Sequence, residues 1–471
     1  MDHVYAGERA VKAERDLYLP PTAGHRANGF GRNALSGNAA SGEAAYQAYM
    51  HRAVFYGFTR DAVAGLLGLI HRKPGTVVVP PALEPMLDSM TAQGESVHLL
   101  WRRITEAQLR KSRLGLLVDM PSGGNADALP YVALYDAQSV INWDDGIRDQ
   151  GRQALELVVL DESGFARAAN FQWDYRKQYR VLAMSNVVAS ITSVDQDASA
   201  EGVYMFGVAS DRGEVPAFVS SMTLDAIPFV FVNANDTCAE PDQPALLNLA
   251  NLDLAVYRGQ ADYRQALYLQ GQDTLVCVGR TKTQMDLPVG AGAVLDVPAG
   301  GDAKFIGVAA AGIGEQRQAL EADIARAMMV SVQMLDTSGG AESGEALRVR
   351  VSARTASLAS LQHTAAQAIK DCLVHAGKWL RLPDSDLEMI EVTPNLDFAE
   401  GTVDASSVNA LIDAIAKGAP LSMRSFHAWL QQKGYTTKDF DQEMLEVGED
   451  PGVDESAGVP AVDPVPDAGG E

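Results

Sequence analysis

The sequence predicts an α+β fold in which long helices flank a block of short strands. Apolar residues recur at steps of three, four or seven over residues 43–70 and again over residues 346–380. This is the period of helices that bury one face. Between these segments, residues 131–235 hold short apolar or alternating runs separated by Asp, Gly and Ser, a pattern typical of strands.

Residues 1–42 are rich in Gly, Asn, Pro and Ser and are expected to form an irregular N-terminal arm. From Glu43 the helical pattern continues to Ile70, and Lys73-Pro74-Gly75 ends it because the residue before proline avoids the α region. This helix presents Tyr46, Tyr49, Ala53 and Tyr56 on one face. A strand, a Pro-Pro break and a helix follow in VVVPPALEPM. The next two predicted elements are a helix over Val97–Arg110 and a strand in LGLLVDMPSGG.

After the strand block, Pro244 suits the first position of a helix, because its φ angle is fixed near the helical value. A Gly- and Pro-rich segment, residues 271–301, surrounds the strand candidates TLVCVG, AVLDV and KFIGV. A helix then runs from Gly314 to about Leu335. After a break in DTSGGAESGE, a second helix is predicted to reach Leu380.

The C-terminal part is predicted to hold a short strand and loop over Asp384–Phe398 and helices over Val408–Lys417 and Met423–Gln432. From Asp439 onward the chain carries acidic but no basic residues, and its end is rich in Pro and Gly. Such a composition buries too little apolar surface to offset the entropy of ordering, so a disordered tail is expected.

The amino-acid composition disfavours several classes of function. The 471 residues include 38 Lys and Arg against 61 Asp and Glu, a net charge of −23. Gripping DNA normally takes a basic surface that neutralises phosphates, so a conventional DNA-binding protein is disfavoured. The sequence has no signal peptide and no apolar run long enough for a membrane span. Three scattered cysteines, Cys238, Cys277 and Cys372, indicate a reduced, cytosolic chain.

Motifs for catalysis and cofactor binding are weak or missing. No phosphate-binding loop, zinc motif or nucleophile elbow occurs, and Gly290-Ala291-Gly292 reads as a turn. Asp144-Asp145 also reads as a turn, and Asp384 with Asp386 as a polar loop. We therefore expect no enzymatic activity, no cofactor and no metal. Arg348, Arg350 and Arg354 form a basic cluster that serves as a solvated face or as intersubunit salt bridges, or alternatively contacts DNA phosphates.

Several segments, in order, resemble one phage-encoded family. They are AYQAYMHRAVFYGFTRDAVAGLLGLIHRKPGTVVVP, LRKSRLGLLVDMPSG, YVALYDAQSVINW, IPFVFVNAN, PALLNLANLDLAVYRGQADYRQALYLQGQDTLVCVG and SGEALRVRVSARTASLASL. The family, long carried as a domain of unknown function, looks like the portal proteins of tailed bacteriophages. The resemblance covers roughly residues 43–400, and the matching segments are collinear.

The resemblance implies a homo-oligomeric ring, usually of about twelve subunits, at one capsid vertex of the virion. Double-stranded DNA is packaged through its channel, without sequence preference, and is later ejected through it. The implied partners are the large subunit of an ATP-driven terminase, the major capsid protein and a head-tail adaptor, with no membrane. Assembly is expected in the host cytoplasm.

The resemblance also implies a division of the chain. After the N-terminal arm come an α/β wing, a first stem helix, a clip, a second stem helix, a tunnel loop, a long helix with a return to the wing, a crown and the acidic tail. Their ranges are 43–243, 244–269, 270–312, 313–335, 336–345, 346–403, 404–446 and 447–471. The loop residues expected to line the DNA channel are Asp336, Thr337, Ser338, Gly339, Gly340, Ala341, Glu342 and Ser343.

Two other classes of function stay open from the sequence. One is a different phage head component, such as an adaptor or a scaffold-like binder. The other is a hydrolase whose dispersed carboxylates form no recognisable motif. The missing phosphate-binding loop suits a passive conduit driven by a separate motor, and the acidic charge suits a channel through which DNA must slide.

Overall fold

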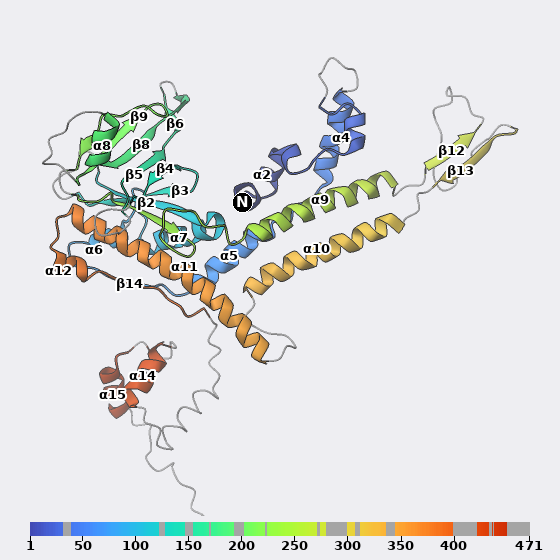
Figure 1. Cartoon of the computed structure of the whole chain (residues 1–471). Helices are drawn as coiled ribbons and strands as arrows, with labels where there is room; N and C mark the ends of the chain where they lie inside the picture. Colours follow the sequence, from blue (N-terminus) through green and yellow to red (C-terminus); the bar gives the residue numbers. More distant parts are fainter. Residues whose placement is uncertain are drawn as a thin grey trace, which may run out of the picture. The chain divides into compact units, whose positions relative to one another are not determined.

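The computed structural model shows a chain of two compact units, Met1–Phe398 and Ala399–Glu471. Helices and strands both contribute extensively, which confirms the α+β expectation (Figure 1). The structure describes residues 1–31, 39–121, 128–146, 154–168, 171–192, 202–221, 224–270, 274–278, 299–306, 311–335, 344–398, 422–432, 436 and 438–449.

Two antiparallel sheets form a sandwich in the first unit. The smaller sheet has the order β11-β2-β3 and the larger the order β10-β9-β8-β5-β4. The strands of the smaller sheet are β2 (Arg113–Asp119), β3 (Tyr131–Asp136) and β11 (Phe229–Asn233). Those of the larger sheet are β4 (Val140–Asp144), β5 (Leu157–Asp161), β8 (Tyr179–Met184), β9 (Tyr204–Ala209) and β10 (Val219–Ser220). The strand block predicted over 131–235 is therefore confirmed, although it also contains a helix, α8 (Ser185–Thr192).

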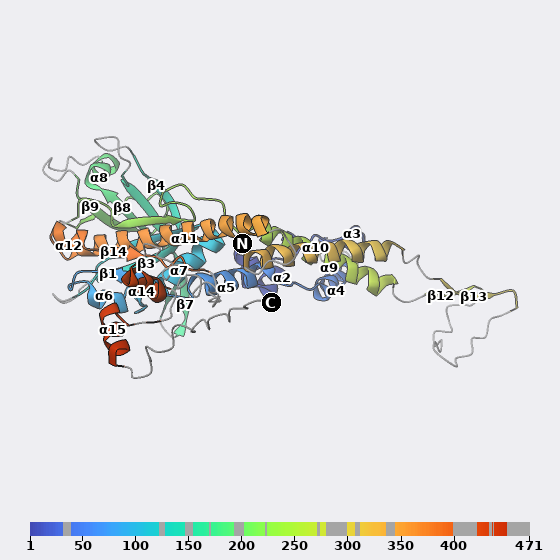
Figure 2. The same cartoon turned by 90° about the horizontal axis from the view of Figure 1, so that it is seen from below.

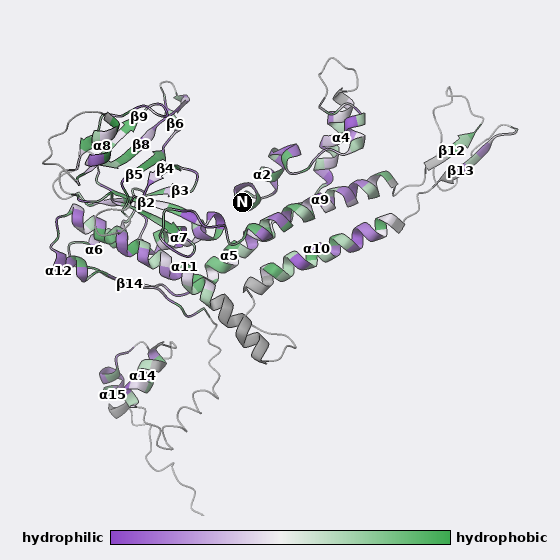
Figure 3. Ribbon diagram, in the orientation of Figure 1, coloured by the Kyte–Doolittle hydropathy of each residue, from purple (hydrophilic) through white to green (hydrophobic). Residues whose placement is uncertain are grey.

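The smaller sheet is buried on both faces. Leu114, Leu116 and Val118 of β2 face one apolar core, whereas Leu117 faces the core between the two sheets. Successive side chains of a strand point to opposite faces, so a strand covered on both sides needs a continuous apolar run. This requirement explains why β2 was recognisable from its sequence, and Figure 3 shows hydrophobic residues along the inner strands.

Two helices, α7 (Val97–Lys111) and α11 (Gly344–Trp379), cover the outer face of the smaller sheet. The half of α11 that packs there buries apolar and small side chains: Leu361, Ala365, Ala368, Ile369, Cys372, Leu373 and Ala376. Buried polar groups join the two helices, since Gln108 Nε2 donates to Thr364 Oγ1 over 2.7 Å. The predicted long helix and the helix from Val97 are both confirmed.

Distant parts of the chain meet beside this layer. β1 (Thr76–Val78) pairs antiparallel with β14 (Glu391–Thr393), next to the short helices α6 (Glu84–Asp88) and α12 (Asp384–Glu388). The sequence predicted only a strand and a loop over 384–398. The helix α12 corrects that expectation, and Pro383 is its N-cap residue, with an extended backbone.

A pair of antiparallel helices extends from the sandwich (Figures 1 and 2). They are α9 (Leu247–Gln270) and α10 (Ala311–Leu335), and the hairpin of β12 (Thr274–Val278) and β13 (Asp302–Ile306) lies beyond their far end. Both helices were predicted. However, α9 begins three residues after Pro244, and α10 begins before Gly314. We call α9, α10 and this hairpin the arm.

The N-terminal region corrects two expectations. Residues 1–31 are not irregular but form α1 (Asp2–Ala6), α2 (Glu8–Ala13), a 3-10 turn and α3 (Ala23–Ala27), which bury Val4, Val11 and Leu19. The helix predicted from Glu43 to Ile70 is two helices, α4 (Ala39–Arg52) and α5 (Phe58–Ile70). Gly57 separates them with φ of 77°, a left-handed conformation that glycine adopts without strain.

In the second unit, α14 (Met423–Gln432) confirms a predicted helix, and α15 (Phe440–Glu449) was not predicted. Arg424 Nη2 donates to Asp441 Oδ1 over 2.7 Å between these two helices. Because α15 continues to Glu449, the first three residues assigned to the acidic tail are helical. The helix predicted over 408–417 and the rest of the tail lie outside the described residues.

Candidate functional site

The arm is the feature most distinct from the sandwich, and its two helices meet along a narrow seam. Leu249 of α9 and Ala327 of α10 are buried together against Ala62 of α5. Further along the seam, Gly259 of α9 lies so close to α10 that an added Cβ would stand 3.3 Å from Leu320 Cδ1. Small side chains at these positions therefore let the helices approach closely.

A buried carboxylate fixes the base of the arm. Asp253 of α9 is 1% exposed and accepts hydrogen bonds from the Phe58 and Thr59 backbone N–H groups, at 3.1 and 2.8 Å, and from Thr59 Oγ1 at 2.7 Å. The first N–H groups of a helix lack partners within the helix, and Gly57 has no side chain that could cap them. Asp253 thus caps α5 from another helix. Burial raises the pKa of this carboxyl, although its hydrogen bonds to Thr59 and Phe58 oppose the shift.

The flank of α9 is held by α4 and the N-terminal segment. Tyr49 Oη donates to Asp262 over 2.6 Å, and Arg258 Nε donates to the Tyr18 carbonyl over 2.8 Å. Burial raises the pKa of Tyr49, and the Asp262 carboxylate adds to this effect, so the phenol stays protonated and can donate. An apolar cluster including Tyr46 and Tyr257 lies beneath these contacts.

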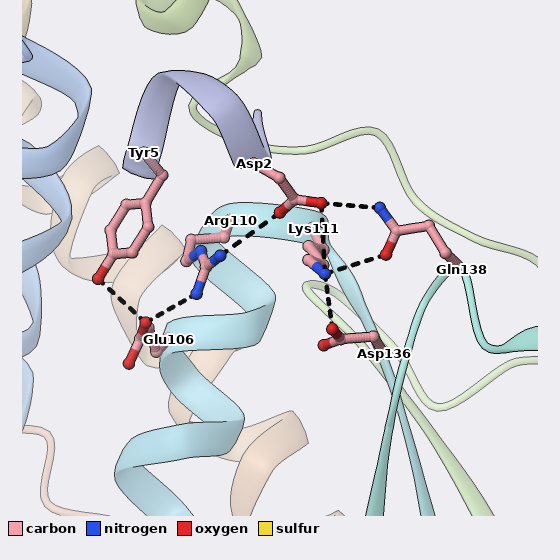
Figure 4. Close-up of polar contacts among 7 residues, drawn as sticks. All are labelled: Asp2, Tyr5, Glu106, Arg110, Lys111, Asp136 and Gln138. Atoms are coloured by element: carbon pink, nitrogen blue, oxygen red, sulfur yellow. Dashed lines mark hydrogen bonds and ion pairs between the residues drawn. The ribbon is translucent and has the colours of Figure 1, made fainter. Parts of the chain in front are cut away.

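Two linked clusters of polar side chains connect the first helix, α1, to α7 and β3 (Figure 4). In the first, Tyr5 Oη donates to Glu106 Oε1 over 3.0 Å, and Arg110 Nη1 donates to the same oxygen over 2.9 Å. Arg110 also places its guanidinium 3.9 Å from the centroid of the Tyr5 ring. Arg110 therefore contacts α1 and α7 together through both its charge and its planar face.

The second polar cluster centres on Lys111, whose side chain is only 10% exposed. Its Nζ atom lies 3.4 Å from Asp2 Oδ2 and 2.8 Å from Asp136 Oδ2. Gln138 Nε2 also donates to Asp2, over 2.9 Å (Figure 4). Burial raises the pKa of Asp2, but attraction to Lys111 and Arg110 and the bond from Gln138 outweigh it, and the net pKa lies below the usual 3.8.

The site residues predicted from the sequence are only partly placed. Asp336 to Ser343 lie outside the described residues, between the end of α10 and the start of α11. Gly344 and Glu345, which the sequence assigned to the same break, already belong to α11. Arg348, Arg350 and Arg354 belong to helix α11. Their side chains lie outside the part of the chain that the structure describes. Gly290 to Gly292 are not described either.

A cavity of about 340 Å³ beside α11 brings together the titratable groups Asp145, Cys238, Asp371 and His375. Burial raises the pKa of the Cys238 thiol, and the nearby Asp236 carboxylate raises it further. Because the thiolate is the nucleophile, this shift lowers the reactivity of Cys238. Burial lowers the pKa of His375 to about 4, so its imidazole is neutral. The cavity lining therefore holds a protonated thiol and a neutral imidazole.

Within the described ranges, no cluster of three His, Cys, Asp or Glu residues could hold a metal ion. Asp384 and Asp386, weighed from the sequence as cation ligands, lie in the first turn of α12. Nor does any helix in the described part have the length and apolarity to cross a membrane. Of the three cysteines, Cys238 is exposed, Cys277 is half-buried and Cys372 is buried, and none is paired with another.

Sequence reasoning missed Asp253. Its position in α9 reads as an ordinary polar site, and its partners Phe58 and Thr59 lie more than 190 residues away in sequence. A local pattern cannot report a cap supplied by a distant helix. The one available signal was negative: α5 starts after Gly57 without a Ser, Thr, Asp or Asn to cap it.

Residues 245–380, from the start of the arm to the end of α11, match a family model described as Domain of unknown function (DUF4055). No curated protein matches the chain. The chain is similar to one in the solved structure "Virion of native gene transfer agent (GTA) particle", with 13% identity over 80% of this chain and 89% of that chain and a TM-score of 0.41.

Two more solved structures are similar. "Neck of empty GTA particle computed with C6 symmetry" has 13% identity, 80% and 89% coverage of this chain and that chain, and a TM-score of 0.39. "Neck of native GTA particle computed with C12 symmetry" has 12% identity, 79% and 89% coverage, and a TM-score of 0.38.

We predict that Asp253→Ala destabilises the first unit, because three donors at the start of α5 lose their acceptor. The free energy of unfolding should fall by about 1–3 kcal/mol, the typical cost of unpaired buried groups. Asp253→Asn keeps an acceptor oxygen and should lose less. Urea denaturation of both variants checks this order, and an Asp253→Ala variant as stable as the unchanged protein would contradict the capping role.

We predict that the docking of α1 weakens in acid. The ion pairs lower the folded-state pKa of Asp2, so its contribution is complete above 3.8 and disappears as the pH falls through the lower folded-state value. Hydrogen exchange of residues 2–6, corrected for intrinsic rates, should accelerate in that range. Asp2→Asn should exchange faster already near neutral pH and show a smaller acid effect. Equal acid responses in both proteins would contradict this role for Asp2.

Proposed function

We propose that this chain is the subunit of a phage portal, a ring-shaped conduit for double-stranded DNA. The observation that carries the proposal is the order of elements in and after the arm. Helix α9, the β12–β13 hairpin and α10 leave the sandwich and return to it. Helix α11 then runs across the smaller sheet. The sequence resemblance implies the same order of stem, clip, stem and long helix.

The surface of α10 supports assembly with other copies. Among its side chains in the described part, only Leu320, Ala327 and Ser331 are buried, whereas Met328 and Met329 are about half exposed. Polar and apolar residues both recur along the arm in Figure 3. A helix of 25 residues gains most of its stability from packing. Neighbouring subunits in a ring would supply the packing that a single chain lacks.

The far end of α9 has the same character. Leu267, Tyr268 and Leu269 are 41%, 65% and 63% exposed. Three consecutive large apolar residues on the surface are typical of contact regions and not of solvated helices. In the proposed ring, this part of the arm meets adjacent subunits beside the β12–β13 hairpin, which would form the clip.

The electrostatics suit a passive conduit. A chain with a net charge of −23 repels the DNA phosphates, so the DNA slides with little adhesion and no sequence preference. We propose that an ATP-driven terminase supplies the motion, and that the ring sits at a capsid vertex of the virion between the major capsid protein and a head-tail adaptor. The chain itself would then carry no catalytic centre.

We propose that residues 336–343 line the channel, where they connect α10 to α11. Deleting Ser338–Ser343 should leave ring assembly intact and lower the fraction of heads that retain DNA, because the moving DNA loses a polar guide. The measurement compares ring formation by electron microscopy with DNA content per head. Deletion of residues 455–460 from the acidic tail, a segment of equal length, serves as the control.

Two results would contradict the channel role. One is a loop deletion that prevents ring formation, since the segment would then be an interface element. The other is unchanged DNA content in heads that contain the shortened subunit.

A further inference from the structure

A two-stranded hairpin between β5 and β8 exposes an aromatic face. It consists of β6 (Gly164–Arg167) and β7 (Trp173–Arg176), and the pairing register places Phe165 opposite Tyr175 and Arg167 opposite Trp173. Residues opposite each other and two apart share a face of a hairpin. Phe165, Arg167, Trp173 and Tyr175 therefore lie on one side. The other side carries Gly164, Ala166, Asp174 and Arg176.

This aromatic face is unusually open. Phe165, Trp173 and Tyr175 are 70%, 63% and 60% exposed, and Phe171, at the start of the returning segment, is 85% exposed. The Arg167 guanidinium lies 5.6 Å from the centroid of the Phe171 ring. In Figures 1 and 2 the hairpin projects from the sandwich. An isolated hairpin is marginally stable in water, so such a surface is expected to gain a partner.

The chemistry of the face favours a protein partner over a nucleic acid. It presents several rings and one cation, Arg167, whereas DNA affinity grows with the number of neutralised phosphates. Lys177, at the base of the hairpin, is already paired with Asp211 over 3.4 Å. Aromatic residues and arginine are the side chains enriched in protein interfaces and among the residues that dominate their binding energy.

Charge complementarity favours a second copy of this chain as that protein. The hairpin segment 164–177 carries three cations and one anion, a net charge of +2. The whole chain has a net charge of −23, so the residues outside this segment carry −25. A copy of this chain thus offers the hairpin an attractive field. Such complementarity steers association and fixes orientation more than it adds affinity, so a specific receptor surface is also needed.

The outer face of the larger sheet supplies a receptor surface. A groove of about 390 Å³ lies there, and Asp211 and Glu214 lie along it. Its walls are mainly apolar and include Ile141, Leu157, Val159, Val181, Val215 and Phe218. Val215 is 49% exposed in the single chain. Arg212 also lines the groove, and Asp211 is already paired with Lys177 of its own chain. The apolar walls, with Glu214 beside them, are therefore the part of the groove that complements aromatic rings flanking one arginine.

We propose that the aromatic face of the β6–β7 hairpin docks into this outer groove of a second copy. The two surfaces differ, so the contact is head-to-tail, and repetition of one head-to-tail contact gives a ring when the rotation between successive copies closes. The inference rests on the proposed assembly of several copies and adds the residues of one contact to it. The aromatic rings would supply most of the binding energy, and Arg167 would face Glu214 in the groove.

The test is a photo-crosslink in the full chain. Trp173→p-benzoylphenylalanine should yield, on illumination, a product with the mass of two chains that joins residue 173 to the segment 209–218. The same photoreactive residue placed at Asp174, on the opposite face of the hairpin, should yield little of it. Val215→Glu, which puts a charge into the groove at an exposed position, should abolish the product.

Each other outcome overturns the inference in a recognisable way. A crosslink to a different segment, to another virion protein or to nucleic acid assigns the hairpin a different partner. Assembled particles without the two-chain product contradict the docking and leave the proposed ring intact. A protein that has the mass of one chain at every concentration contradicts both.

Discussion

The packing of α11 on the three-stranded sheet is the contact on which the rest of the first unit depends. Between Ala365 and Ala376 the helix buries small and branched side chains against β2, β11 and α7. The Trp379 indole N–H then donates to the Val118 carbonyl over 3.0 Å and fixes the end of the helix. Because β2 is also buried from the other side, a shift of α11 would disturb both cores.

A second fixed point orients the arm. Asp253 joins α9 to the start of α5, and α5 in turn packs against α7, α9 and α10. The arm is therefore anchored at its base by a buried, hydrogen-bonded carboxylate, while its exposed surface has few apolar contacts within the chain. The base of the arm is thus fixed, but many side chains along its length are exposed. For this reason we propose that other copies of the chain pack against the arm.

Sequence patterns revealed the elements whose burial is regular. The long apolar stripe predicted α11, the run after Arg113 predicted β2, and helical periodicity predicted both helices of the arm. Sequence patterns failed where a single residue, or a contact between distant segments, determines where an element begins, ends or pairs. Gly57 splits one apparent helix through its positive φ. The strand β14 was predicted, but its pairing with β1, more than 300 residues away, was not. The N-terminal helices are too short for a period to show, and the aromatic alternation around Trp173 was overlooked. The predicted loop 336–343 lies outside the described residues.

The central claim is that identical subunits close into a ring, and the mass of the purified full-length protein tests it most directly. A ring of about twelve subunits, the number that the family resemblance implies, has about twelve times the 50.3 kDa of one chain. The account predicts a discrete particle of roughly that mass, measured by native mass spectrometry or mass photometry. A single species of 50.3 kDa over the whole accessible concentration range would contradict it.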